Sequence, residues 1–234
     1  MSRPLTAYLA LALAVLFAAS PFFVPDFGGF DAEQFPVPQE DPPVQPAGYA
    51  FSIWGVIYLW LIAGLGYGAL RRAEDGAWHA MRLPLIVSLA VGAAWLAVAV
   101  ASPVWASVLI WVMLISALVA LFRSPVQDSW FAALPVGLYA GWLSAASCVS
   151  LGLLAAGYGF VEETTAALGA IFLALVIASA VQSQLRRAPS YGIAVIWALI
   201  AVVVQNYATN STVAALAAGG AIALIFPTVR AARS

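Results

Sequence analysis

Aromatic side chains that lie close together in one uncharged segment are the residues of this sequence best suited to hold a ligand. Residues 46–58 read PAGYAFSIWGVIY and place Phe51, Trp54 and Tyr58 within eight positions, with no charged residue among them. Tryptophan and tyrosine combine a flat apolar ring with a polar N–H or O–H group, so they either stack on planar molecules or anchor a helix at a membrane surface. The chemistry that these residue types offer is non-covalent binding.

Patterns typical of enzymes are missing from the rest of the chain. No HExxH, GxSxG, Walker or GxGxxG motif occurs in a setting that could support its chemistry. Lysine is absent, which excludes a retinal Schiff base. The only histidine, His79, lies near Glu74 and Asp75, and this trio could hold a weakly bound cation or belong to a solvated loop. We therefore expect no enzymatic activity, no catalytic or metal-binding residues and no required cofactor.

The composition is that of an integral membrane protein. Of the 234 residues, 64% are hydrophobic and 8% are charged, whereas soluble proteins carry about 25% charged residues. The mean hydropathy is +0.99. A net charge of −1 gives no reason to expect a nucleic-acid partner, and the single cysteine, Cys148, excludes an intrachain disulfide. The lipid bilayer is the partner that this composition predicts.

Eight apolar segments have the length of about 20 residues that one bilayer crossing needs. They are residues 5–24, 48–70, 83–101, 104–122, 131–156, 164–183, 190–206 and 211–229. The first also resembles a secretory signal, but its apolar run exceeds the usual about 7 to 15 residues and cleavage would leave Pro21 at the new terminus, so we expect a retained span. Pro103 is well suited to begin the fourth helix, because its missing N–H needs no partner there. The predicted fold class is an all-α integral membrane protein with eight transmembrane helices.

The positions of the arginines test this topology independently, because basic residues near lipid are held on the cytoplasmic side. With eight spans and an inside N-terminus, all nine basic residues are cytoplasmic: Arg3, Arg71, Arg72, Arg82, Arg123, Arg186, Arg187, Arg230 and Arg233. We predict a multi-pass protein of a bacterial-type inner (cytoplasmic) membrane with both termini in the cytoplasm. In this scheme Arg82 and His79 lie in the loop between the second and third spans. The predicted spans hold no ionisable acid, base or histidine, which weighs against a proton-coupled pump.

The order of features resembles a known family. A first helix, a proline-rich loop and then PAGYAFSIWGVIY are similar to the tryptophan-rich sensory protein and translocator protein family (TspO/MBR), whose second helix opens with a pattern like PPGWxFGPVWxxLY. Pro46, Phe51, Trp54 and Tyr58 match that pattern in order. SPVWASVL places Trp105 at the start of the fourth helix, and LPVGLYAGWLSAAS resembles the family's fifth helix. The resemblance covers about residues 5–155.

The resemblance implies a five-helix bundle that encloses a pocket for porphyrins, other tetrapyrroles and sterol-like ligands. Residues 1–157 would form this TspO-like domain, with residues 25–47 as an outer, lid-like loop, and residues 158–234 would add three transmembrane helices. The loop is acidic and rich in proline, and from its residues alone a lid and a simple spacer remain equally open. The ligand-binding residues implied are Phe51, Trp54, Tyr58, Trp95, Trp105, Tyr139 and Trp142.

The function that we expect is that of a membrane receptor or carrier with a sensory or regulatory role. It would bind a planar apolar ligand, either a tetrapyrrole such as a porphyrin or a sterol- or isoprenoid-like molecule, in the aromatic pocket. The alternatives are a small-molecule transporter and a structural or assembly subunit of a membrane complex, and a homodimer remains open. Deep tryptophans also pack between helices, so the residue types alone leave packing and ligand binding as competing interpretations.

Overall fold

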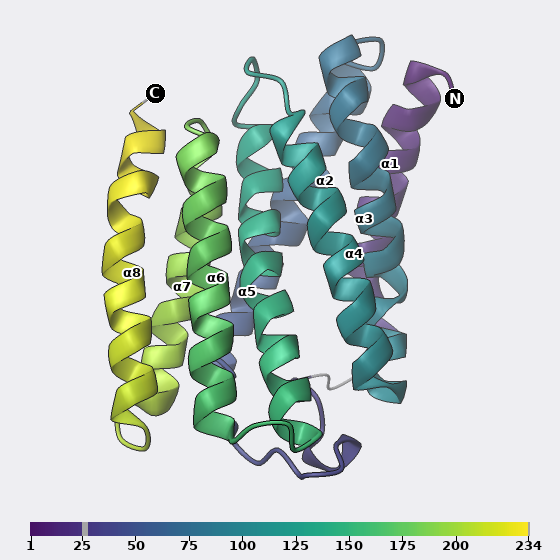
Figure 1. The fold of residues 1–234 in the computed structure, drawn as a ribbon. Coiled ribbons are helices and arrows are strands. Elements are labelled where there is room, and N and C mark those ends of the chain that lie inside the picture. The colour runs from purple at the N-terminus through teal and green to yellow at the C-terminus, as the bar shows by residue number, and fades with distance from the viewer. Residues whose placement is uncertain (25–27, 234) are drawn as a thin grey trace.

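The fold is a bundle of eight long helices (Figure 1), seen in a computed structural model that describes residues 1–24 and 28–233. The helices are α1 (Arg3–Ala19), α2 (Ile53–Arg71), α3 (Gly76–Ala101), α4 (Pro103–Phe122), α5 (Ala133–Gly157), α6 (Glu163–Gln184), α7 (Pro189–Asn206) and α8 (Ser211–Ala232). Three short 3-10 helices, η1 (Ser20–Phe22), η2 (Ala32–Gln34) and η3 (Gly48–Ser52), lie between α1 and α2. All eight, with α1 taken together with η1 and α2 together with η3, are long and apolar enough to cross a membrane. The predicted all-α, multi-pass membrane fold is confirmed.

The start of α3 corrects one predicted boundary. The third span was expected from residue 83, but α3 begins at Gly76 because the Asp75 carboxylate accepts hydrogen bonds from the backbone N–H groups of Ala77 and Trp78, at 2.8 and 3.1 Å. His79 and Arg82 therefore lie in a helix and not in a loop. The His79 ring pairs with the Thr6 hydroxyl at 2.9 Å, and no cluster of three metal-ligating side chains occurs in residues 1–24 and 28–233.

Arg82 is fully buried, and its guanidinium joins α3 to the end of α2. It donates hydrogen bonds to the carbonyl oxygens of Gly68, Arg72 and Ala73, at 2.7, 3.0 and 3.3 Å. These carbonyls lie at the C-terminal end of α2, where backbone acceptors lack partners within the helix and the dipole favours a positive charge. Arg82 also stacks over the Trp78 ring, 5.3 Å from its centroid. Three carbonyl oxygens and the Trp78 ring thus stabilise the charge inside the bundle, while the buried Nε atom has no hydrogen-bond partner among the described residues.

Asp128 links the segment between α4 and α5 to two earlier helices. Its carboxylate accepts hydrogen bonds from Arg72 at 2.7 Å, from the Tyr67 hydroxyl at 3.2 Å and from the Trp78 indole at 3.3 Å. The hydrogen bond from Arg72 is the main reason that the pKa of Asp128 lies below its usual range. The contact fixes where α5 begins relative to α2 and α3.

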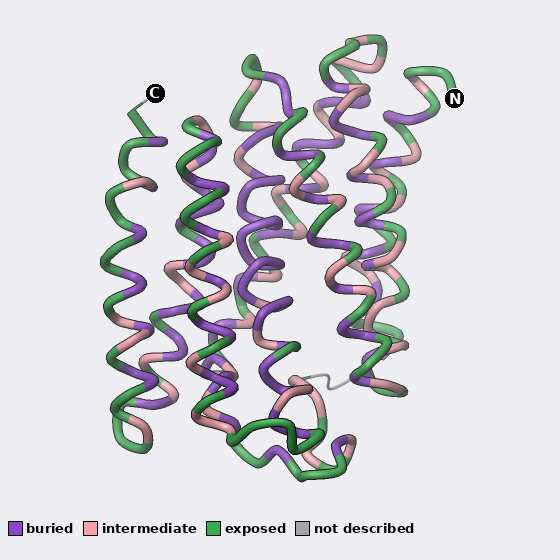
Figure 2. The backbone as a smooth tube through the Cα atoms, viewed as in Figure 1, coloured by how far each residue is buried: buried purple, intermediate pink, exposed green. Residues whose placement is uncertain are grey.

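The central helix of the bundle is α5. It packs against α2, α4, α6 and α7. Within its apolar, membrane-spanning stretch 72% of the residues are buried, against 28 to 56% in the corresponding stretches of the other helices. In Figure 2 its tube is mostly in the colour of buried residues. Figure 1 shows α1, α3 and α4 on one side of α5, α6 to α8 on the other, α2 crossing behind α5, and both termini at the same end. The boundary predicted at residues 157 and 158 falls at the C-terminal end of α5, and the division into two domains stays a prediction.

Two glycines of α2 let neighbouring segments approach its backbone closely, as the GxxxG spacing of Gly64 and Gly68 indicates. A methyl group at Gly64 would overlap the carbonyl oxygen of Phe131, and one at Gly68 would overlap the Trp78 ring and lie 3.2 Å from the Arg82 guanidinium. Gly66, on the same helix, has open space at its Cα.

Replacing Gly68 with alanine is therefore expected to destabilise the bundle. The added methyl must displace the buried Trp78 ring, and such overpacking costs about 1–3 kcal/mol. Gly66→Ala is the matched control and should be neutral or slightly stabilising, since alanine favours helix more than glycine does. Thermal unfolding in detergent micelles measures both variants, and equal midpoints would contradict the assigned contact.

Candidate functional site

The segment that precedes α2 is held against α7, and this contact orients the aromatic residues of α2. The Ala47 N–H donates to the carbonyl oxygen of Ala201 at 3.1 Å, and the Trp197 indole donates to that of Ala50 at 3.0 Å. Tyr49 meets the Trp197 ring edge to face, with ring centroids 5.5 Å apart. These contacts leave Tyr49 at the surface and turn the following residues toward the interior of the bundle.

Trp54 lies at the centre of a cluster of rings from α1, α2 and α5. It stacks on Tyr58, one turn further along α2, with centroids 5.3 Å apart and planes 21° apart. Phe17 of α1 meets both rings edge to face, at 5.6 and 5.1 Å, and Trp142 of α5 meets Trp54 at 6.2 Å. Stacked and edge-to-face geometries are those that aromatic pairs prefer. The cluster is therefore a packed wall whose ring positions are mutually determined.

This wall borders a cavity of about 550 Å³, which we call the aromatic cavity. Its volume lies within the roughly 300–1,000 Å³ of small-molecule sites. Its lining includes Phe17, Trp54, Tyr58, Trp95, Met113 and Trp142, and none of the described lining residues is charged. The Trp95 indole N–H is already used, because it donates to the carbonyl oxygen of Ala106 at 2.8 Å. The cavity thus offers ring faces and apolar surface, and it suits a small hydrophobic molecule.

Five of the seven predicted site residues line the aromatic cavity: Phe51, Trp54, Tyr58, Trp95 and Trp142. Tyr139 is fully buried beside it, where its ring contacts Phe17 and Trp54 and its hydroxyl pairs with Ser88 at 2.9 Å. Tyr139 thus supports the wall from outside the cavity lining.

Trp105 is the one predicted residue that the structure leaves away from the cavity. Its side chain is 63% exposed at the start of α4. The buried face of α4 carries Ala106, Ile110 and Met113, spaced three or four residues apart as one helix face requires, and Trp105 lies off that face. The cavity instead receives Ile110 and Met113 from α4.

Phe17 is the main cavity residue that sequence reasoning missed. The buried positions of α1 include Ala7, Ala10, Ala14 and Phe17. This three- and four-residue spacing marks one helix face on which only Phe17 is large. A comparison of side-chain sizes along that face would have identified Phe17 as the residue of α1 that borders an internal space.

The outer loop is a packed cover over the end of the bundle opposite the termini. The Val37 N–H donates to the carbonyl oxygen of Gly157 at 2.8 Å, and the Asn206 amide donates to that of Pro43 at 2.9 Å. The Gln34 amide donates to two carbonyl oxygens at the end of α3, and Phe35 is buried. Residues 25–27, which belong to the predicted lid-like loop, lie outside the described residues. The described part of the loop is fixed to α3, α5 and α7.

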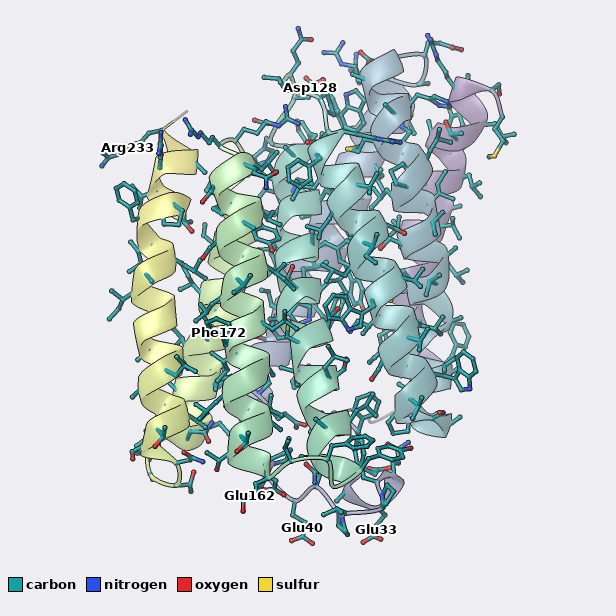
Figure 3. The ribbon with its side chains drawn as sticks, viewed as in Figure 1. Glu33, Glu40, Asp128, Glu162, Phe172 and Arg233 are labelled. Carbon is teal, nitrogen blue, oxygen red and sulfur yellow. The ribbon has the colours of Figure 1, made fainter. Side chains whose placement is uncertain are left out.

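The arginines of the protein lie at one end of the bundle, whereas acidic residues lie at both ends. Figure 3 shows Glu33, Glu40 and Glu162 at the end covered by the outer loop, whereas Asp128 and Arg233 lie at the opposite end. All nine arginines stand at or near helix ends on the side of the two termini, as the alternation of helix direction requires. Phe172, on α6 between these ends, is 64% exposed, as expected for a side chain in contact with lipid.

Comparison with known proteins gives one match. The model of the family described as TSPO-like protein matches residues 5–230, a range that extends beyond α5 and includes α6, α7 and nearly all of α8. No curated protein and no solved structure matches the chain.

The position of Tyr139 predicts that Tyr139→Phe affects stability more than ligand binding. The substitution keeps the ring contacts with Phe17 and Trp54 but removes the hydrogen bond to Ser88, which contributes about 0.5–1.5 kcal/mol. The unfolding midpoint should therefore fall, while affinity for a ligand of the aromatic cavity should stay within twofold. Unfolding and ligand titration of the same preparation measure both effects. A selective loss of affinity would mean that the Tyr139 hydroxyl touches the ligand.

Proposed function

We propose, on the premise that this chain belongs to the TSPO-like protein family, that it is a membrane receptor or carrier with a sensory or regulatory role and that it binds a planar apolar ligand. The observation that carries this proposal is the aromatic cavity, whose walls present Trp54, Tyr58, Trp95 and Trp142 to one space of about 550 Å³. A flat molecule in that space would gain from burial of its apolar surface, at about 25 cal/mol per Å², and from stacking on these rings.

The chemistry of the lining supports binding rather than catalysis. None of the described residues that line the aromatic cavity is a carboxylic acid, an arginine, a serine or a histidine. Among them only the Tyr58 hydroxyl is of a type that can move a proton, and it has no charged partner in the lining. Binding through ring faces requires no cofactor. Tetrapyrroles, sterols and isoprenoids are the ligand classes that such a lining suits.

The orientation that we propose places both termini in the cytoplasm and the outer loop on the far side of an inner membrane. The separation of charge supports it, because every arginine lies on the side of the termini. Lipid-proximal arginines are retained on the cytoplasmic side during insertion.

A ligand titration with two tryptophan variants tests the proposed site. Trp54→Ala removes the ring at the centre of the cluster and should weaken binding of protoporphyrin, or of a sterol probe, by tenfold or more, which corresponds to about 1.4 kcal/mol. Trp105→Ala is the matched control, since it removes an exposed tryptophan outside the cavity, and its affinity should equal that of the unmodified protein. Equal affinities in the two variants would exclude the aromatic cavity as the site.

The charges near the cavity further predict a preference for uncharged ligands. The lining includes Pro21, Val24 and Gly28, so the cavity reaches the end of the bundle that bears the outer loop. The charged residues described at that end are all acidic: Asp31, Glu33, Glu40, Asp41, Glu162 and Glu163. A ligand with carboxylates would meet like charge there and would find no arginine to pair with.

Protoporphyrin and its dimethyl ester share one ring and differ in charge, so they measure this preference. The ester should bind several-fold more tightly at low salt, and added salt should narrow the difference by strengthening the binding of the diacid. Glu33→Gln should also reduce the difference in affinity by strengthening the binding of the diacid. Glu74→Gln, the same change at the opposite end of the bundle, should leave the difference unchanged. Tighter binding of the diacid at low salt would contradict the prediction.

A further inference from the structure

A second, smaller cavity of about 90 Å³ shares part of its lining with the aromatic cavity, including Trp142, and we call it the alanine slot. It is formed between α5, α6 and α7, and Val44, Gln45 and Pro46 of the outer loop also line it. These helices include two that the five-helix resemblance did not cover. The slot therefore belongs to a part of the protein for which the sequence predicted no site.

The slot exists because small side chains face one another from three helices. Ala145 of α5, Ala170 and Ala174 of α6 and Ala198 of α7 all line it, and each is less than 10% exposed. Leucine or isoleucine at these positions would fill the space, as large residues do in most protein interiors, where voids larger than a water molecule are few. An apolar cavity of this kind stays dry, so what it accommodates is an apolar group.

The two cavities share part of their lining. Phe51, Trp95, Ile110, Trp142 and Ala146 border both. Phe51 and Trp142 meet edge to face, with ring centroids 5.9 Å apart and planes 80° apart. A molecule that lies on Trp142 in the aromatic cavity is therefore next to the slot, and a substituent on that molecule needs to pass only these side chains to enter it.

The size and chemistry of the slot restrict what can occupy it. Its volume is about one sixth of that of the aromatic cavity, which excludes a second ring system of the same size but leaves room for part of a slender chain. None of the described residues that line it is charged. Its polar side chains are those of Gln45 at the outer loop, Cys148 and Ser150, and the Ser150 hydroxyl already donates to the carbonyl oxygen of Ser147 at 2.8 Å. A hydrocarbon chain loses no hydrogen bond on entering such a space, whereas a polar substituent does.

We propose that the ligand has two parts, a neutral planar ring that lies in the aromatic cavity and a hydrocarbon chain that enters the alanine slot. This inference rests on the proposed function and narrows it to one class of ligand, a ring that carries a prenyl or similar apolar chain. The helices α6 and α7 thereby contribute directly to ligand selection, because they form the walls of the slot that contact the hydrocarbon chain of the ligand.

A matched pair of naphthoquinones tests the proposal. Menadione supplies the ring without a chain, and the same ring with a geranyl chain supplies both parts, while quenching of tryptophan fluorescence reports the affinity of each. In the unmodified protein the chain should raise affinity by tenfold or more. Ala174→Leu fills the slot and should remove most of that gain, while affinity for menadione stays within twofold.

Two further variants separate a specific slot from general attraction to lipid or detergent. Ala180→Leu adds the same side chain to an exposed position of α6 and should leave the gain from the chain unchanged. Ala198→Val narrows the slot from α7 by a smaller change and should reduce the gain as well. Binding of menadione in each variant shows that the bundle remains folded.

The outcomes distinguish this inference from the function on which it rests. If menadione binds and Trp54→Ala weakens it, but the chain adds nothing or Ala174→Leu and Ala180→Leu act equally, then the alanine slot is not a chain site and the aromatic cavity remains one. If neither quinone binds the unmodified protein, both this inference and the ring-binding function are overturned for this ligand class. A gain that is lost in Ala174→Leu and kept in Ala180→Leu supports the two-part ligand.

Discussion

The hydrocarbon interior of a bilayer offers no hydrogen-bond partner, and this constraint governs the rest of the structure. Each polar group at membrane depth must find its partner within the protein. The eight helices satisfy most of the backbone, and side chains satisfy carbonyl groups where the helices stop. Arg82 does so at the end of α2, Trp197 at Ala50 before the start of α2, and Asn206 at Pro43 in the outer loop. The same contacts set the positions of α2 and the outer loop. The hydrogen bonds that satisfy these carbonyl groups therefore also shape the cavity.

The cavities follow from the role of α5 as the central helix. Its small residues let α6 and α7 approach closely, and its large residues, Tyr139 and Trp142, meet the rings of α1 and α2 on the other side. Trp142 and Ala146 border both cavities. Residues of η3, α3 and α4 border both cavities as well, so α5 forms part of the boundary between the aromatic cavity and the alanine slot. Because α5 packs against α2 and α4 and also against α6 and α7, a ligand that displaces α5 would also displace helices on both sides of it.

The separation of charge places the uncharged cavity beneath an acidic surface. Arginines gather at one end because insertion retains them on one side of the membrane, and the outer end keeps only acids among its described charged residues. None of the described residues that line the aromatic cavity is charged. Under the proposed function, selection among ligands depends on shape, on apolar area and on repulsion of anions at the surface, and it does not depend on a specific ion pair.

The sequence by itself determined the number of helices and most of their bounds, because a bilayer crossing demands an apolar run of a definite length and the arginines mark one side. The resemblance to a known family pointed to Trp54, Tyr58 and Trp142, and the local GxxxG spacing indicated close packing at Gly64 and Gly68. Only the tertiary structure decided that α3 begins at the Asp75 cap, that Trp105 faces outward and that Phe17 faces the cavity. Which side of a helix faces its neighbours depends on how all the helices rotate to bury their surfaces together. The residues that meet in the alanine slot come from the successive helices α5, α6 and α7 and from the outer loop, which lies far from them in the chain.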